Sequence, residues 1–211
     1  MTSTVVVFLV VATIFSIGDW WAVHASKKSL QYVCKPLATV GFLATAIAIA
    51  DAESVPQTWR IIAFVFCLLG DVFLMLPRDA FVPGLASFAI AQICFAVSLL
   101  NEDVTTLRLL IGIVIVVPAI LVLARRFIRH ISTSGHKELV LPVMVYMVVI
   151  AAMATSAIAG ATAIGIVGAI FFMLSDSLIA EQRFVKERAW QPVGIMVTYH
   201  VALAGLALGL V

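Results

Sequence analysis

Residues 139–180 read LVLPVMVYMVVIAAMATSAIAGATAIGIVGAIFFMLSDSLIA, and Asp176 is their only charged residue. The run has 42 residues, and a membrane-spanning helix needs about 20 predominantly apolar ones. We therefore expect two spans here, joined by a turn at Ala159-Gly160-Ala161-Thr162, where small residues interrupt the run. The turn decides the topology, because a single span in this stretch would reverse the direction of the final helix.

The rest of the chain has the same apolar character. Of its 211 residues, 64% are hydrophobic and 11% are charged, whereas an ordinary soluble domain carries about 25% charged residues. A globule of this size could not bury so much apolar surface. The composition indicates one integral membrane domain over residues 1–211 and excludes soluble enzyme folds and disulfide-built secreted domains. A net charge of +2 is too mild to indicate a nucleic-acid partner.

Eight apolar runs, bounded by charged residues, proline or glycine, predict an all-α polytopic membrane protein built as an eight-transmembrane-helix bundle. The expected spans are residues 4–23, 34–50, 58–76, 81–100, 104–124, 139–159, 162–180 and 191–211. No positively charged region precedes the first run, so we interpret it as a retained span and not as a signal peptide.

Basic residues mark one side of the predicted bundle. Eleven of the 13 Lys and Arg residues lie in or beside the connections after spans one, three, five and seven, and only Arg60 and Arg108 lie on the opposite side. The eleven are Lys27, Lys28, Lys35, Arg78, Arg125, Arg126, Arg129, Lys137, Arg183, Lys186 and Arg188. Because cytoplasmic loops are enriched in Lys and Arg, we expect both termini to face away from the cytoplasm. The expected location is a bacterial inner (plasma) membrane.

The two halves of the chain share a short pattern. Phe66–Asp71 and Phe171–Asp176 both read F-x-x-L-small-D at an offset of 105 residues, and Pro36 and Pro142 lie 106 apart. The pattern is consistent with two parallel four-helix repeats, an arrangement known in membrane proteins. Chance similarity between apolar segments is the alternative interpretation.

Three acidic residues, Asp19, Asp71 and Asp176, lie inside predicted spans. An Asp at the centre of a membrane helix costs roughly 2.5–3.5 kcal/mol, so such residues usually face a cavity or a partner. All three precede the end of their span by about one turn, which puts them roughly 6–8 Å below the basic side. They could line one cavity that opens to that side. Alternatively, Asp19 reaches the interface beside Trp20 and Trp21, and the other two hydrogen-bond neighbouring helices in a purely structural role.

Other polar residues within the spans are candidates for substrate contact or for simple packing. They are Gln92, Tyr146, Tyr199 and His200. Lys35 precedes Pro36 at the expected first turn of the second span, a position that suits proline. There Lys35 could contact a phosphate head group, because helix N-termini and ammonium groups both favour anions. It could also simply extend to the interface.

The residue types that commonly bind metals are not spaced as a metal site requires. The histidines and cysteines are His24, His130, His136, His200, Cys34, Cys67 and Cys94, and they form neither an H-x-x-x-H nor a C-x-x-C pattern. We expect neither a metal nor an organic cofactor.

Four motifs together resemble the lysoplasmalogenase family, also called the YhhN family, of multi-span membrane proteins. They are Lys35-Pro36-Leu37, the segment Leu69–Pro77 (LGDVFLMLP) with Phe81 and Gly84-Leu85, the segment Leu174–Ala180 (LSDSLIA) with Arg183-Phe184, and Tyr199 in the last span. The resemblance covers nearly the whole chain. Two positions depart from it: the family often has His where this chain has Gln92, and Gln near Leu203.

The resemblance implies hydrolysis of the vinyl ether bond of lysoplasmalogens, which yields a fatty aldehyde and glycerophosphocholine or glycerophosphoethanolamine. Vinyl ethers hydrolyse through carbon protonation and an oxocarbenium ion, so paired carboxyls suit the reaction as they suit glycosidases. Asp71 and Asp176 are the expected catalytic pair, one protonated and one ionised. The expected substrate contacts are Lys35, Asp19, Tyr199, Gln92, His200 and Tyr146, and the partner is a lysophospholipid.

Other interpretations of the same residues remain open. The buried acids could serve a proton-coupled transporter, or a lipid-binding or lipid-sensing protein that lacks activity. An intramembrane aspartyl protease would need G-x-G-D and Y-D, but Leu68 and Ser175 occupy the positions of the missing Gly and Tyr. Small residues such as Gly205 and Gly209 could pack within the chain or form a homo-oligomer.

Overall fold

The computed structural model describes residues 2–50, 54–133 and 137–209. In these residues it has eight α-helices, a short 3-10 helix and no strand, and all eight α-helices are long and apolar enough to cross a membrane. The elements are α1 (Ser3–His24), α2 (Lys28–Ile49), α3 (Val55–Met75), α4 (Phe81–Leu100), α5 (Thr106–Thr133), η1 (Lys137–Leu139), α6 (Val140–Gly160), α7 (Ala163–Phe184) and α8 (Gln191–Leu208). The predicted fold class is confirmed.

The turn between the sixth and seventh helices lies where the sequence predicts it. α6 ends at Gly160 and α7 begins at Ala163, and the Thr162 hydroxyl caps α7 by accepting from the Gly165 N–H at 3.3 Å. α2 begins at Lys28, so Pro36 lies inside this helix. The expectation that Pro36 occupies the first turn is therefore wrong. α5 continues to Thr133, well beyond the span expected to end near residue 124.

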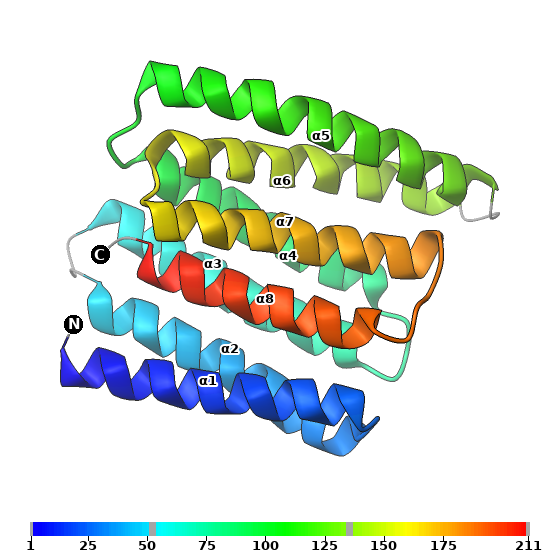
Figure 1. Ribbon diagram of the computed structural model, residues 1–211, viewed down its shortest axis with the longest axis horizontal. Helices are drawn as coiled ribbons and strands as arrows, with labels where there is room; N and C mark the ends of the chain where they lie inside the picture. The colour runs from blue at the N-terminus through cyan, green and yellow to red at the C-terminus, as the bar shows by residue number, and fades with distance from the viewer. Residues whose placement is uncertain (1, 51–53, 134–136, 210–211) are drawn as a thin grey trace.

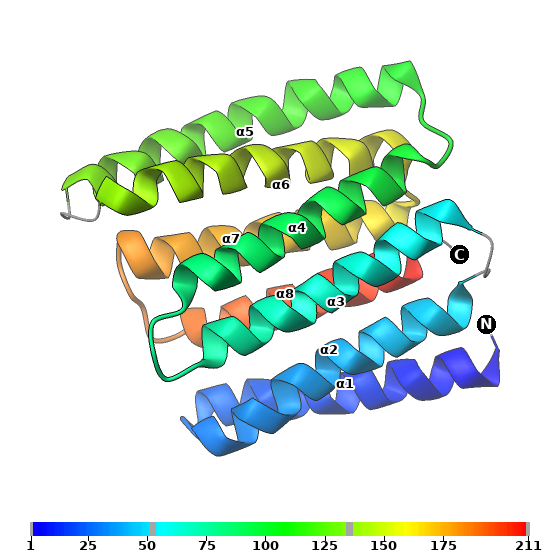
Figure 2. The same cartoon turned by 180° about the vertical axis from the view of Figure 1, so that it is seen from behind.

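Successive helices pair as antiparallel hairpins. The pairs α1–α2, α3–α4, α5–α6 and α7–α8 make extensive contacts. Figures 1 and 2 show the α1–α2 and α5–α6 hairpins at opposite edges, with α3–α4 and α7–α8 packed between them. The helices α3 and α7, which carry Asp71 and Asp176, therefore belong to the centre of the bundle.

The connections α1–α2, α3–α4 and α7–α8 lie at one end of the molecule, on the right in Figure 1, where α5 ends and α6 begins. The eleven basic residues named above lie in these connections or near the helix ends beside them. We call this the basic end. Arg60 and Arg108 lie near the starts of α3 and α5, toward the opposite end. The grouping of charge is that expected of a membrane protein with one cytoplasmic side.

The α7–α8 hairpin is held by glycines in direct contact. A Cβ on Gly205 would lie 2.6 Å from the Gly168 Cα, and a Cβ on Gly209 would lie 2.6 Å from the Gly165 Cα. Close backbone approach through small residues is a common way to join membrane helices. Gly205 and Gly209 thus pack within the chain, and this contact fixes the position of Tyr199 on α8 relative to α7.

We expect Gly205→Leu to lower the free energy of unfolding in detergent by at least about 2 kcal/mol, because the new side chain would meet the α7 backbone. Thermal or denaturant unfolding would measure the change. Val167→Leu on α7 is the control, since Val167 is 46% exposed and a larger side chain has room there. Equal stability of the two variants would contradict the close α7–α8 contact.

Candidate active site

Asp71 on α3 is fully buried and is the centre of a polar network. The Lys35 ammonium lies 3.1 Å from Asp71 Oδ1. The Thr39 hydroxyl donates to Asp71 Oδ2 at 2.6 Å, and the Tyr199 hydroxyl donates to the same oxygen at 2.9 Å. Three helices, α2, α3 and α8, therefore converge on one carboxylate.

The geometry of α2 explains two of these contacts. Lys35 and Thr39 are four residues apart, so they lie on one face of the helix, one turn above the other. The side chains of Lys35 and Asp71 are 5% and 0% exposed. A charge taken out of water needs a partner and further hydrogen bonds, and each member of this pair supplies the counter-charge of the other. The sequence analysis does not single out Thr39, although its position four residues after Lys35 places both side chains on one face of a helix.

Two further predicted site residues lie beside this network. Asp19 on α1 is fully buried and close enough to Lys35 and Asp71 for electrostatic interaction. The alternative that Asp19 merely reaches the interface is therefore wrong. Trp20 Nε1 donates to His200 Nδ1 at 2.9 Å, so Nε2 carries the hydrogen of a neutral His200 ring. Among the described residues, neither the Asp19 carboxylate nor His200 Nε2 has a hydrogen-bond partner.

Asp176 on α7 belongs to a second network. The Tyr146 hydroxyl on α6 donates to Asp176 Oδ2 at 2.5 Å. Gln92 on α4 is fully buried and lies close to Tyr146. No cation pairs with Asp176 in the part of the chain that the structure describes. The two acids thus differ, since Asp71 has a counter-ion and Asp176 has a neutral hydrogen-bond donor.

One side chain lies close to both networks. Cys67 on α3 is fully buried, lies beside Tyr199, and is within electrostatic range of both Asp71 and Asp176. No hydrogen bond between described residues joins the two carboxyl groups directly. The structure therefore brings the predicted acids into one region but holds each by its own partners.

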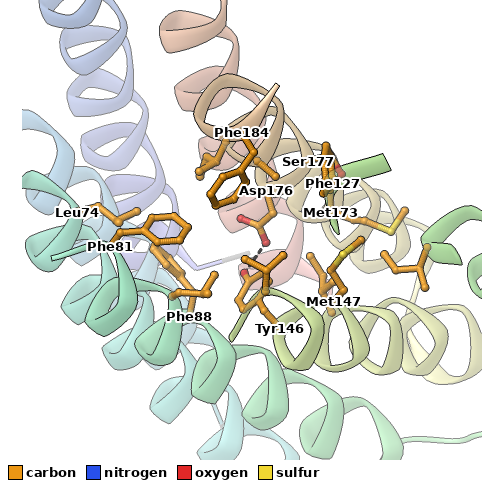
Figure 3. Close-up of a pocket in the computed structure, with 16 residues that line it drawn as sticks. Leu74, Phe81, Phe88, Phe127, Tyr146, Met147, Met173, Asp176, Ser177 and Phe184 are labelled. Atoms are coloured by element: carbon orange, nitrogen blue, oxygen red, sulfur yellow. Dashed lines mark hydrogen bonds between the residues drawn. The ribbon is translucent and has the colours of Figure 1, made fainter. Parts of the chain in front are cut away.

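Asp176 lines an apolar cavity, which we call the inner cavity (Figure 3). Figure 3 shows Asp176 and Tyr146 pointing toward each other, surrounded mostly by apolar side chains. The other residues that line the inner cavity come from helices α3 to α7. They include Leu74, Phe81, Leu85, Phe88, Ile120, Phe127, Met147 and Met173. The lining of the inner cavity is thus predominantly apolar, with one carboxyl group, Asp176, among its residues.

A larger, more polar pocket opens at the basic end, and we call it the vestibule. Its lining includes Lys28, Gln31, Tyr32, Lys35, Gln182, Arg183 and Glu187. Leu74, Phe81 and Ile179 line both the vestibule and the inner cavity. We call these three residues the junction, because a molecule that occupied both pockets would pass them.

The junction relates the two acids to each other. Leu74 follows Asp71 by three residues on α3, and Ile179 follows Asp176 by three residues on α7. Both acids therefore lie about one helical turn inside the junction, about 4.5 Å along each helix. Asp176 faces the inner cavity itself, whereas Asp71 lies behind Lys35, which lines the vestibule.

Arg183 covers the outer side of the junction. Its guanidinium lies over the Phe81 ring at 4.0 Å from the centroid and pairs with Asp79 at 2.6 Å. Phe81 in turn packs edge-on against Phe184 at 5.8 Å between centroids. The connection between α3 and α4 is thus tied to the end of α7. Arg183 and Phe184, which follow the acid on α7, thus both contact Phe81.

The described residues contain no group of three or more His, Cys, Asp or Glu side chains able to hold a metal ion.

The family model for the YhhN family matches residues 30–210. The chain belongs to the YhhN family. The match includes Lys35, Asp71, Asp176 and Tyr199, whereas Asp19 on α1 precedes it.

Two curated relatives of this YhhN protein are named lysoplasmalogenase, one from Mycobacterium bovis and one from Mycobacterium tuberculosis. Each is 30% identical over 172 residues, which cover 78% of this chain and 65% of the relative. The match therefore spans less than two thirds of the relatives' own length. No solved structure matches the chain significantly.

Proposed function

We propose that this YhhN protein hydrolyses the vinyl ether bond of lysoplasmalogens, releasing a fatty aldehyde and a glycerophosphoethanolamine or glycerophosphocholine. The names of its relatives support a hydrolase of this kind. The observation that carries the proposal is the position of the two acids, each one turn inside the junction between a polar vestibule and an apolar cavity.

An amphiphilic substrate fits the two pockets in one orientation. Its head group occupies the vestibule, where polar and charged side chains gather, and its hydrocarbon chain enters the inner cavity. The vinyl ether connects the glycerol to the chain, so it lies at or just inside the junction. This is the depth of Asp71 and Asp176, and binding in this register turns proton transfer into a step between neighbouring groups.

Asp176 is the proposed general acid. It faces the inner cavity without a cation partner among the described residues, and the Tyr146 hydroxyl bonded to one oxygen orients the carboxyl group. The acid proton is transferred to the vinyl carbon farther from oxygen, which leaves an oxocarbenium ion. Water then adds to the carbon next to oxygen, and the resulting hemiacetal separates into an aldehyde and the free glycerol hydroxyl.

Asp71 is the proposed carboxylate partner. Its negative charge stabilises the oxocarbenium ion from a buried position, where electrostatic effects are strong. The Tyr199 hydroxyl passes the proton of the attacking water to Asp71 Oδ2, to which it is already hydrogen-bonded. After the products leave, Asp71 releases this proton to solvent and Asp176 takes one up, which restores the starting state. The Lys35 ammonium has three N–H donors. One contacts Asp71, and the others can hold the water or the glycerol oxygen.

The remaining predicted contacts support this arrangement from further away. Gln92 lies behind Tyr146, and Asp19 and His200 lie around Lys35 and Tyr199. Because cytoplasmic loops are rich in Lys and Arg, we infer that the basic end faces the cytoplasm. The vestibule would then open to the inner leaflet, where a single-chain lipid can enter from the membrane.

We expect the purified protein in detergent to release aldehyde from lysoplasmenylethanolamine or lysoplasmenylcholine, and not from the matching saturated alkyl ether, which has no vinyl carbon to protonate. Coupled aldehyde reduction would measure the rate. Well-folded protein that releases no aldehyde from either vinyl ether would contradict the proposal. Lipid uptake or proton movement in vesicles made with the same preparation would then favour a transporter.

A further inference from the structure

The charges that line the vestibule are not all paired within the described part of the protein. Three cations and one anion line it: Lys28, Lys35, Arg183 and Glu187. Lys35 pairs with Asp71 and Arg183 pairs with Asp79. Lys28 and Glu187 form no salt bridge with any described residue. The vestibule thus presents one uncompensated positive group and one uncompensated negative group.

The two unpaired groups come from different elements. Lys28 is the first residue of α2, and Glu187 lies in the connection between α7 and α8. The Gln182 side-chain amide donates to Glu187 Oε1 at 3.1 Å, which orients that carboxylate. Because both groups line the same pocket, a ligand that satisfied both charges would carry an anion and a cation.

We propose that the vestibule binds a zwitterionic phosphoethanolamine-type head group, with Lys28 contacting the phosphate and Glu187 contacting the primary ammonium. This inference rests on the proposed function, because it names the substrate class of the same site. Arg183, which is partly exposed beside Phe81, offers the phosphate a second cation.

The cation that Glu187 fits best is a primary ammonium. A carboxylate accepts N–H hydrogen bonds, and a charged hydrogen bond of this kind is stronger than a neutral one. A quaternary ammonium has no N–H and is recognised by faces of several aromatic rings. The aromatic residues of the vestibule are Tyr32 and Phe81, and the Phe81 ring already carries the Arg183 guanidinium. The lining therefore favours ethanolamine over choline.

The test uses saturated 1-O-alkyl lysolipids, which lack the vinyl bond and cannot be cleaved by this route. Three head groups are compared on the full-length protein in detergent: phosphoethanolamine, phosphocholine, and phosphate alone. Isothermal titration calorimetry measures each Kd. We expect the phosphoethanolamine lipid to bind about tenfold more tightly than the other two, a difference that one charged hydrogen bond can supply.

Two variants test the proposed roles of Glu187 and Lys28 separately. Glu187→Gln is expected to reduce the preference for phosphoethanolamine to less than about twofold, whereas Lys28→Gln weakens all three lipids by about tenfold. Both residues are exposed, so the substitutions leave the core intact. Glu138→Gln is the control, since Glu138 lies at the same end but does not line the vestibule, and it should leave every Kd unchanged.

The outcomes separate this inference from the proposed function. A preference for phosphoethanolamine that survives Glu187→Gln overturns the inference, even when vinyl ethers are cleaved. An equal Kd for all three lipids in the wild-type protein overturns it too. Loss of the preference in Glu187→Gln supports the inference, even when no aldehyde is released, because the binding lipids are not substrates.

Discussion

Asp176→Asn is expected to lower the rate of aldehyde release from lysoplasmenylethanolamine by at least about a hundredfold, the usual contribution of a general acid. Asn has nearly the size of Asp and still offers an oxygen to the Tyr146 hydroxyl, so the α6–α7 contact at 2.5 Å can persist. It has no acidic proton to transfer to carbon. The rate at saturating substrate measures the effect, and the thermal midpoint in detergent checks the fold.

Tyr146→Phe is the matched control for this prediction. It keeps the Asp176 carboxyl group and removes the hydroxyl that orients it, so we expect a loss of about tenfold, in line with one hydrogen bond. The order of the two variants distinguishes proton donation from packing. A rate in Asp176→Asn within about threefold of wild type would exclude Asp176 as the acid, while the family membership would still stand.

Helix count and the depth of the acids were accessible from the sequence for physical reasons. Apolar length is a direct requirement of the bilayer, and the eight runs satisfy it one by one. Depth follows from the rise per residue along a helix, so the sequence predicts Asp71 and Asp176 near one level. In the structure both lie about one turn inside the same junction. Neither argument depends on how the helices pack.

The partners of the acids depend on helix rotation and packing, which the apolar pattern does not specify. Apolar residues occur on every face of α1, so its sequence does not indicate which face is buried. Asp19 could therefore be assigned either to the interface or to the interior. The structure buries it beside Lys35. Similarly, Tyr146 meets Asp176 only because α6 packs on α7.

The position of Lys35 in the sequence is compatible with more than one role. Its position near the basic end suggested a head-group contact, but its ammonium is buried against Asp71. An acid and a base at similar depth in adjacent spans indicate a pair, since neither is stable alone in the membrane. Conversely, nothing in the sequence distinguishes Lys28 and Glu187 from other charges near helix ends, and only the structure shows that both line the vestibule.

Lys35→Met is expected to destabilise the protein by about 3–5 kcal/mol, the usual effect of removing one member of a buried ion pair. Met fills a similar volume but leaves the fully buried Asp71 carboxylate without its counter-ion. The midpoint of thermal unfolding in detergent would fall accordingly. An unchanged midpoint would contradict the buried pair. Lys28→Met is the control, because Lys28 is exposed and unpaired among the described residues.

The double variant Lys35→Met/Asp71→Asn separates structure from catalysis. It removes both charges at once, so most of the lost stability should return, because a neutral buried pair has no charge to compensate. The amide oxygen introduced by Asp71→Asn would still accept the hydroxyls of Thr39 and Tyr199, which keeps α2, α3 and α8 together. Aldehyde release should nevertheless stay at least about a hundredfold below wild type, because the carboxylate that receives the proton is gone. Recovery of both stability and turnover would mean that Asp71 only holds the helices together, and the proton from water would then need another acceptor.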